Sequence, residues 1–412
     1  MIFLKLVGTF LVGYLYELYS IYTVIQSNTN FIKLFMNQEG PSKKKREFKQ
    51  KYYLGIQIRL LTSYTQFLFI IFVYIQYTYI DLFSYVNTIQ AMGLSLISNP
   101  STQQSSSLEC LFLDMGIDPN NVTYYKVLYW LALPFLKIVL TIFIFLVLYS
   151  KNKTTDLKSD IWIAILTLII NEQPGILLNL SKLYSCFLQN LDGVGFAMLD
   201  PNISCSDPRY LDFKTYILNP ALVLWGVILP LTLLIITLLS RDRLNNPDFR
   251  LRYGGIINSY RGDMFYWGII TMLYRLFLMI SLVSIDSVVT ALATASIITF
   301  IYYSLFSRIH PYNSEEFNKL EKYSIISYLV TFFFLIYTSE NKYQMVSWIS
   351  ATMIIGGNLW VVLYFVKNIY SKWRESRNRV RKMSLESSRK SSAGIPLEES
   401  VDTSKLFLNS DF

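Results

Sequence analysis

Nine long stretches of apolar residues alternate with short polar segments along the chain. A helix rises 1.5 Å per residue, so about 20 apolar residues cross a hydrocarbon core about 30 Å thick. The pattern therefore predicts an all-α, polytopic transmembrane helix bundle. The predicted spans cover residues 2–25, 57–83, 125–149, 161–186, 216–240, 263–285, 287–306, 323–338 and 345–369.

Positive charge is unevenly divided between alternate polar segments. One set of segments holds 28 Lys and Arg residues and the other set holds 4. Cytoplasmic loops retain Lys and Arg, so this asymmetry predicts a cytoplasmic C-terminus and, with nine spans, an outer N-terminus. If the first stretch lies flat on the membrane, the bundle has eight spans and the predicted side of the C-terminus is unchanged.

Three regions follow from these patterns. Residues 1–56 read as a first span or signal anchor followed by a basic loop, and residues 57–370 read as a multi-span bundle. Residues 371–412 are basic and rich in Ser, a composition that buries no core, so we expect a disordered cytoplasmic tail.

Composition narrows the class of protein further. The chain is 53% hydrophobic and 16% charged, with a net charge of +9. The basic residues flank the spans, which argues against a nucleic-acid partner. One His and three Cys are too few for an ordinary His/Cys metal cluster, and no nucleotide-binding or zinc-protease motif occurs. We therefore expect no cofactor, and no nucleophile–base set suggests an enzyme.

The predicted outer loops carry features of an oxidising compartment. Cys186 and Cys205 bracket one loop and are a candidate disulfide. Asn121 and Asn202 begin glycosylation sequons in outer loops, which suggests a glycoprotein.

A polar sequence interrupts the fourth apolar stretch. It reads Asn171-Glu172-Gln173-Pro174-Gly175, and Pro174 with Gly175 predicts a helix break at membrane depth. A carboxylate beside such a break is how transporters build cation sites. The alternative is a simple kink with Glu172 paired or near the outer interface.

Other ionisable residues also fall within the spans. Arg275 lies at a similar depth to Glu172, so we hypothesise a Glu172–Arg275 ion pair, with a purely structural role or a neutral Glu172 facing a cavity as alternatives. Glu17 either faces the bundle or marks an interfacial segment. We expect the remaining basic residues to snorkel or to meet partners: Lys5, Arg59, Lys137 and Lys182.

The predicted inner side carries a connector and two basic clusters. Arg252, Tyr253, Gly254 and Tyr260 belong to a segment that reads either as a gating linker, with a glycine turn, or as a plain connector. Basic residues beside the spans are expected to bind anionic lipid of the inner leaflet. The alternative is that they serve only to set the topology of the chain. The first cluster is Lys43, Lys44, Lys45 and Arg46, and Ser384 and Ser391 in the basic tail are candidate phosphorylation sites.

Four short motifs are similar to those of a known family. They are Ser107-Leu-Glu-Cys110, the loop from Leu183 to Cys205, the segment from Arg252 to Arg275, and His310-Pro-Tyr312 with Asn318 to Glu321. From about residue 60 to residue 370 the chain resembles the multi-pass C-terminal domain of large protist surface proteins, especially ciliate ones. That domain is related in pattern to TRP-like (transient receptor potential-like) and polycystin proteins.

The resemblance implies a TRP-like bundle, with two departures. Gly268 stands where the family usually has an acid after a Tyr-Trp pair. The Cys-rich ectodomain common in the family has no counterpart in this sequence, so its binding role is not carried over. Fold likeness alone does not fix function.

The first functional hypothesis is an ion-conducting or channel-associated protein with a side-chain-lined pathway. The joins at 340–345 and near Asp286 are too short for a pore loop, which argues against a conventional filter. The alternative is a non-conducting receptor or anchor, and the third choice is a transporter that uses Glu172. The expected partners are the lipid bilayer, a cation, and either further copies of the chain or an ectodomain-bearing protein. We expect the protein in the plasma membrane or an endomembrane.

Overall fold

A computed structural model describes residues 2–36, 42–78, 105–151, 157–188, 195–244, 246–285, 287–340 and 344–392. The chain divides into one compact unit through Phe365 and a second unit from Val366 onward. The first unit holds the helix bundle.

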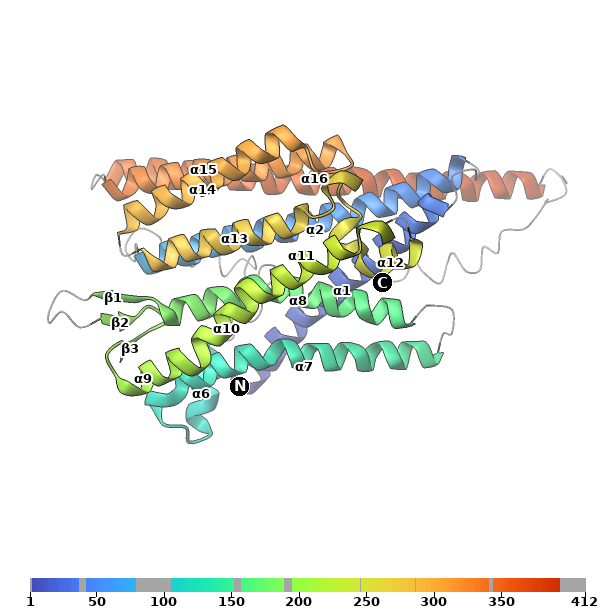
Figure 1. Ribbon diagram of the computed structural model, residues 1–412. Coiled ribbons are helices and arrows are strands. Elements are labelled where there is room, and N and C mark those ends of the chain that lie inside the picture. The colour runs from blue at the N-terminus through green and yellow to red at the C-terminus, as the bar shows by residue number, and fades with distance from the viewer. Residues whose placement is uncertain are drawn as a thin grey trace. The chain divides into compact units, whose positions relative to one another are not determined.

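Helices make up almost all of the described chain, with one small sheet (Figure 1). The helices before the sheet are α1 (Ile2–Met36), α2 (Ser42–Thr78), α6 (Ser105–Asp114), η2 (Pro119–Asn121), α7 (Val122–Lys151) and α8 (Leu157–Tyr184). The sheet comprises β1 (Cys186–Leu188), β2 (Gly195–Ala197) and β3 (Asp200–Ser204). One nearly continuous helical segment comes next, made of α9 (Pro208–Phe213), η3 (Lys214–Leu218), α10 (Asn219–Val223), η4 (Leu224–Ile228) and α11 (Leu229–Leu239). The remaining elements are η5 (Arg241–Arg243), α12 (Pro247–Ile257), η6 (Gly262–Met264), α13 (Trp267–Ser284), α14 (Val288–Ile309), α15 (Glu315–Glu340) and α16 (Gln344–Ser392).

The predicted all-α membrane bundle is confirmed in its class. Within the described residues, seven helical segments are long and apolar enough to cross a membrane. They are 119–150, 157–184, 208–239, 267–284, 288–309, 315–340 and 345–372. These coincide with seven of the nine predicted spans, and the other two fall in α1 and α2. The protein is therefore an integral, multi-pass membrane protein.

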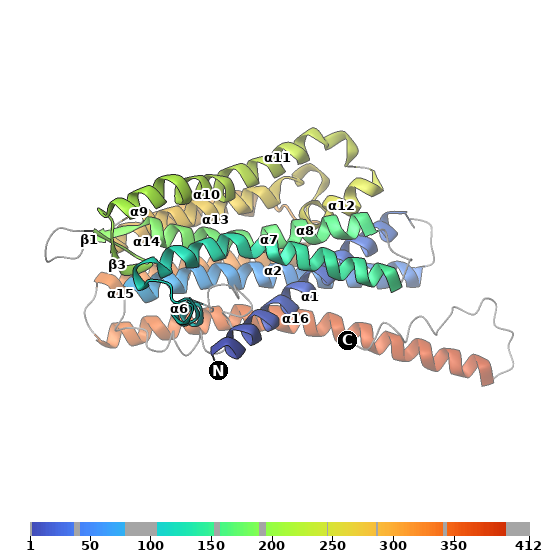
Figure 2. The ribbon, with the colours of Figure 1, turned by 90° about the horizontal axis from the view of Figure 1, so that it is seen from below.

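Helix α8 is the most enclosed of these segments. In the most apolar 18 residues of α8, 61% of the residues are buried. The corresponding 18 residues of the segment that includes α7 are only 22% buried. Helix α8 contacts α1, α7, α12 and α13 (Figures 1 and 2). Helix α7 instead exposes large apolar side chains such as Phe135, Val139 and Phe143. An apolar exposed face suits lipid, so α8 is a central helix and α7 a peripheral one.

Short connections join the last helices in antiparallel pairs. Helix α13 ends at Ser284 and α14 begins at Val288, while α15 ends at Glu340 and α16 begins at Gln344. Three residues in each case leave no room for a pore helix and filter, as predicted from the sequence.

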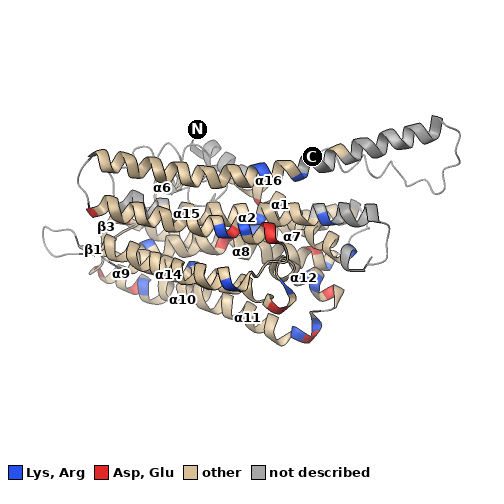
Figure 3. Ribbon diagram, turned by 90° about the horizontal axis from the view of Figure 1, so that it is seen from above, with Lys and Arg blue, Asp and Glu red and all other residues tan. Residues whose placement is uncertain are grey.

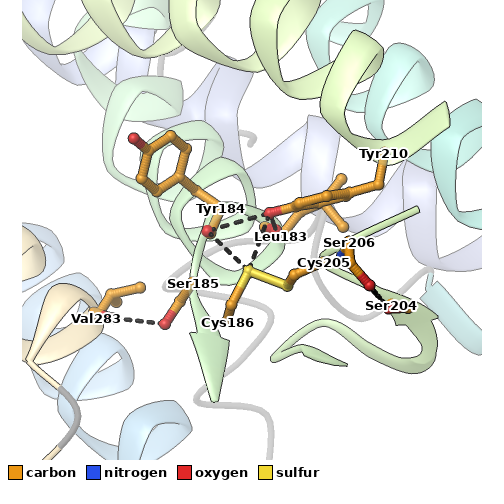
Figure 4. The surroundings of a disulfide bond; sticks show 9 residues. All are labelled: Leu183, Tyr184, Ser185, Cys186, Ser204, Cys205, Ser206, Tyr210 and Val283. Carbon is orange, nitrogen blue, oxygen red and sulfur yellow. Dashed lines mark hydrogen bonds between the residues drawn. A yellow bond between two sulfur atoms is a disulfide. The ribbon is translucent and has the colours of Figure 1, made fainter. Parts of the chain in front are cut away.

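The predicted Cys186–Cys205 disulfide forms at the β-sheet end of the bundle (Figure 4). The Cα atoms of the two residues are 6.2 Å apart, and strands β1 and β3 flank β2 in an antiparallel sheet. The Tyr210 hydroxyl donates to the Leu183 carbonyl at 2.9 Å. These contacts fasten the sheet to the end of α8 and the start of α9.

Charged residues gather toward the end of the bundle that carries α12. The ribbons of α10 and α14 are free of charge over most of their length (Figure 3). The sheet, α6 and α9 lie at the opposite end (Figure 1). The distribution matches the charge asymmetry of the sequence, with the sheet end as the predicted outer side.

Helix α16 departs from the expectation of a disordered tail. It continues to Ser392, so residues 371–392 are helical. Arg, Lys and Glu are good helix formers, and extending an existing helix avoids the cost of a new nucleus. Ser384 and Ser391 lie in this helix, although their side chains, like those of Lys43, Lys44, Lys45 and Arg46 in the first turns of α2, fall outside the described part.

Candidate functional site: a buried charge cluster

The polar sequence from Asn171 to Gly175 lies in the middle of α8. The structure keeps α8 as one helix from Leu157 to Tyr184 with Pro174 inside it, so the predicted helix break at Pro174 and Gly175 is wrong. Pro174 has no N–H and deprives the Ile170 carbonyl of its usual donor, while the flanking turns keep their hydrogen bonds. The Gln66 side chain of α2 donates to the neighbouring Asn171 carbonyl at 3.2 Å. A side chain from another helix thus supports the backbone at this point.

Gln173 repairs a second backbone defect in a different helix. The Leu229 N–H binds the Leu224 carbonyl in the π-helical turn η4, so the Trp225 carbonyl would need a donor from residue 230. Residue 230 is a proline and has none. The Gln173 side chain donates to the Trp225 carbonyl at 2.8 Å and supplies the missing hydrogen bond. Gln173 therefore couples α8 to the proline-rich α9–α11 segment.

Glu172 belongs to a cluster of three buried charged side chains. Lys137 of α7 donates to Glu17 Oε1 at 2.7 Å and also binds Glu172 Oε1. The exposed fractions are 5% for Glu17, 1% for Lys137 and 3% for Glu172. Each residue lies near the middle of its helix, α1, α7 or α8. We call Glu17, Lys137 and Glu172 the charge triad.

The predicted Glu172–Arg275 pair does not form. Glu172 pairs with Lys137, and the Arg275 guanidinium instead donates to the Ser63 hydroxyl of α2. The sequence predicts similar depths in the bilayer for the Lys137 and Arg275 side chains. Helices α7 and α8 form a hairpin, and this brings Lys137 against Glu172. Helix packing, which the sequence does not give directly, therefore decides between the two cations.

The charge triad is not electrically balanced. Two carboxylates face one ammonium, so the triad carries one net negative charge when all three groups are ionised. Glu17 Oε2 is buried and has no hydrogen-bond partner among the described residues. An uncompensated charge is costly in a medium of low dielectric constant, so the triad favours uptake of one further positive charge.

Polar side chains next to Lys137 continue the cluster along α7. The Tyr14 hydroxyl and Thr141 Oγ1 lie 2.8 Å apart, and Thr141 Oγ1 donates to the Lys137 carbonyl at 2.7 Å. These bonds tie α1 to α7 beside the charge triad. They also limit the rotation of α1, which carries Glu17.

Three small cavities approach the charge triad from the α12 end. Their volumes are about 90, 40 and 10 Å³, and Arg59 and Gly255 line all three. The two larger cavities include Asn171, the neighbour of Glu172, and the second also includes Ser20, one turn from Glu17. The cavities therefore reach residues that are one position or one helical turn away from members of the triad. The side chains of the triad itself do not line the cavities.

The candidate gating linker is a helix. Arg252, Tyr253 and Gly254 lie within α12, so the predicted glycine turn is wrong. A Cβ atom on Gly254 would lie 2.8 Å from Asn28 Oδ1, so glycine permits close approach of α1 and α12. Tyr253 stacks on Phe249 with ring centroids 4.7 Å apart.

Tyr260 follows α12 and joins it to the α14–α15 connection. Its backbone pairs with Tyr312, and the two rings lie 4.9 Å apart. Burial raises the pKa of both tyrosines above the ordinary value, so both hydroxyls stay neutral. Both residues also line the largest of the three cavities described above.

The remaining predicted outer sites lie at the sheet end of the bundle. Asn121 ends η2 and Asn202 is exposed in β3. Cys110 is exposed on α6 and forms no disulfide. Glycosylation at the two asparagines stays a prediction.

The sequence alone does not connect two members of the charge triad to Glu172. Glu17 and Lys137 each stand as a single ionisable residue within a predicted span. Residues of opposite charge that lie at the same depth in neighbouring spans are expected to pair. This signal predicts contacts of Glu17 and Glu172 with Lys137.

In comparisons with known proteins, no family model, curated protein or solved structure matches the chain. The residues of the site therefore carry the functional inference.

Proposed function

We propose that the protein translocates ions across the membrane along a side-chain-lined pathway, and that the charge triad takes up and releases a proton. The observation that carries the proposal is the excess negative charge of Glu17, Lys137 and Glu172 in the bundle interior. Ionisable groups in such positions mark ion pathways and proton relays. The TRP-like resemblance of the sequence accords with this class of protein.

The cavities at the α12 end favour a proton over a metal cation. Arg59, Arg252 and Arg275 line them, with Glu321 as the acidic residue among the lining side chains. A metal cation entering by this route would be repelled by the arginines. A proton passes along water and hydroxyl groups, and Ser20 and Thr167 line the second cavity with hydroxyl-bearing side chains.

The experiment is proton flux into liposomes that contain the purified full-length chain. A potassium gradient with valinomycin sets the membrane potential, and a trapped pH-sensitive dye reports proton entry. We expect flux in the wild type and a fall to the level of protein-free liposomes in Glu172→Gln and Glu17→Gln, because each variant leaves a neutral pair with Lys137.

Glu109→Gln is the matched control, since Glu109 is a partly exposed carboxylate paired with Lys126. It removes an acid of the same type without touching the charge triad, so normal flux is expected. Wild-type flux equal to that of protein-free liposomes would reject ion translocation and favour the receptor or anchor alternative. Undiminished flux in both triad variants would reject the role of the triad.

A further inference from the structure

The cavities around Arg59 hold more positive than negative charge. Arg59 and Arg275 line the largest cavity together with Glu321, and Arg59 and Arg252 line the second. The two cavities share Arg59, Ile170, Asn171, Gly255 and Ile256 and so form one region. Three arginines and one glutamate thus line the region.

Hydrogen bonds hold two of these arginine side chains in place and use only part of their N–H donors. Arg59 donates to the Gly255 carbonyl and the Ser259 hydroxyl, and Arg275 donates to the Ser63 hydroxyl. A guanidinium has five N–H donors, so these bonds use only part of the supply. Arg252 Nε is buried and has no hydrogen-bond partner within the part of the chain that the structure describes. A buried donor without a partner is costly unless a ligand or water accepts from it.

Glu321 does not neutralise this group of arginines. It attracts Arg59 and Arg275 electrostatically, but no ion pair within 4 Å links it to either among the described residues. Glu321, Arg59 and Arg275 all line the cavity of about 90 Å³. The residues that line the region therefore carry a net positive charge.

We propose that this region binds a small oxyanion of the phosphate class. Arginine forks match the geometry of phosphate oxygens and bind them through paired N–H donors. An engineered cavity of about 150 Å³ holds benzene, with six heavy atoms. The larger cavity here, at about 90 Å³, suits an occupant of fewer atoms, such as phosphate.

The phosphate could come from solution or from the headgroup of a simple lipid, and the test separates these sources. The full-length protein is purified in an uncharged maltoside detergent without added lipid. Binding of inorganic phosphate is titrated by calorimetry, and binding of short-chain phosphatidic acid is titrated in parallel. Saturable binding of either compound supports the site and identifies the source, and no saturable binding of either overturns the proposal.

Substitutions of the cavity arginines test whether the bound phosphate group lies against them. Loss of one charge-assisted hydrogen bond weakens binding by about tenfold or more, so we expect that effect in Arg252→Gln and in Arg275→Gln. Arg209→Gln is the control, because Arg209 is exposed on α9 at the opposite end. Unchanged affinity in both cavity variants would overturn the proposal.

Gly268 allows a second test that removes no arginine. It lines the largest cavity, and an added Cβ would meet Ile256 Cγ2 at 3.3 Å. Gly268→Asp adds a carboxylate that competes with the oxyanion, whereas Gly268→Ala adds only the Cβ atom. We expect weaker phosphate binding in the first variant than in the second, and equal binding would count against the site. Glu172→Gln should bind phosphate normally, so this result is independent of proton flux.

Discussion

Lys137 is the residue on which the electrostatics of the bundle interior depend. It is buried between Glu17 and Glu172, which would otherwise repel each other in a medium of low dielectric constant. Removing Lys137 leaves two carboxylates without a counter-ion. Removing either carboxylate leaves one balanced pair.

We therefore expect unequal effects on stability from two substitutions in the charge triad. Lys137→Met should lower the free energy of unfolding by about 3–5 kcal/mol, the usual cost of breaking a buried ion pair. Glu172→Gln should cost much less, because the Lys137–Glu17 pair is retained. Unfolding in detergent, followed by circular dichroism against denaturant concentration, measures both, and equal losses would contradict the unbalanced charge of the triad.

The sequence identified Glu172 but not its partner. The polar run Asn171 to Gly175 stands out in an apolar stretch, which made its carboxylate easy to find. Lys137 and Arg275 both lie at a suitable depth. The choice between them depends on which helices pack together, and this is a property of the folded bundle.

At the scale of helices, close approach between α1 and α2 depends on one glycine. A Cβ atom added to Gly55 would lie 2.7 Å from Ser27 Cβ and 3.0 Å from the Thr23 carbonyl oxygen. Helices approach closely in membranes where small residues face each other. Since α1 carries Glu17, this contact also positions the charge triad.

Gly55→Ala should therefore destabilise the protein, by about 1–3 kcal/mol as for other over-packed sites. Gly356→Ala is the matched control, because a Cβ atom there meets nothing within 4 Å and alanine is the better helix former. Thermal unfolding of both variants in the same detergent gives the comparison. A loss in Gly356→Ala as large as that in Gly55→Ala would show that the close contact is not the cause.

Gln173 provides a second prediction at this scale. Gln173→Leu keeps a side chain of similar size but leaves the Trp225 carbonyl without a donor. A buried acceptor left unpaired costs about 1–3 kcal/mol, so the free energy of unfolding should fall by that amount. Denaturant unfolding of the variant and the wild type in the same detergent measures the difference. Equal stability of the two proteins would show that this hydrogen bond does not stabilise the fold.

Apolar periodicity predicted helix existence well because burial in lipid dominates the choice of element. Seven of the predicted spans coincide with helical segments that are long and apolar enough to cross a membrane, and the short α13–α14 and α15–α16 connections were anticipated. Prediction failed where tertiary contacts override local preference. The local sequence predicts a turn at Gly254, which lies within α12, and a break at Pro174, which lies within α8.

At the scale of the whole molecule, the two ends of the bundle differ: one carries the disulfide and the other carries most of the charge. The Cys186–Cys205 bridge, the sheet and α6 lie at one end, and the charged α12 lies at the other (Figures 1 and 3). Positive charge remains on the cytoplasmic side of membranes, so we expect the disulfide end to face outward.

Cys110 allows a test of this orientation. It is exposed on α6 and forms no disulfide, whereas Cys186 and Cys205 are bridged. A membrane-impermeant maleimide should label intact cells without reductant, and Cys110→Ser should abolish the labelling. Labelling that appears once the plasma membrane alone is permeabilised, with the internal membranes still sealed, would place the disulfide end on the cytoplasmic side.

Infrared difference spectroscopy can detect the one exchangeable proton that we assign to the charge triad. Spectra of the membrane-embedded protein are recorded at high and low pH, and the carboxylic acid C=O stretch is followed. We expect a band from a buried protonated glutamate in the wild type and in Glu109→Gln that is missing from both Glu17→Gln and Glu172→Gln. An identical band in all four proteins, or none in the wild type, would contradict the assignment.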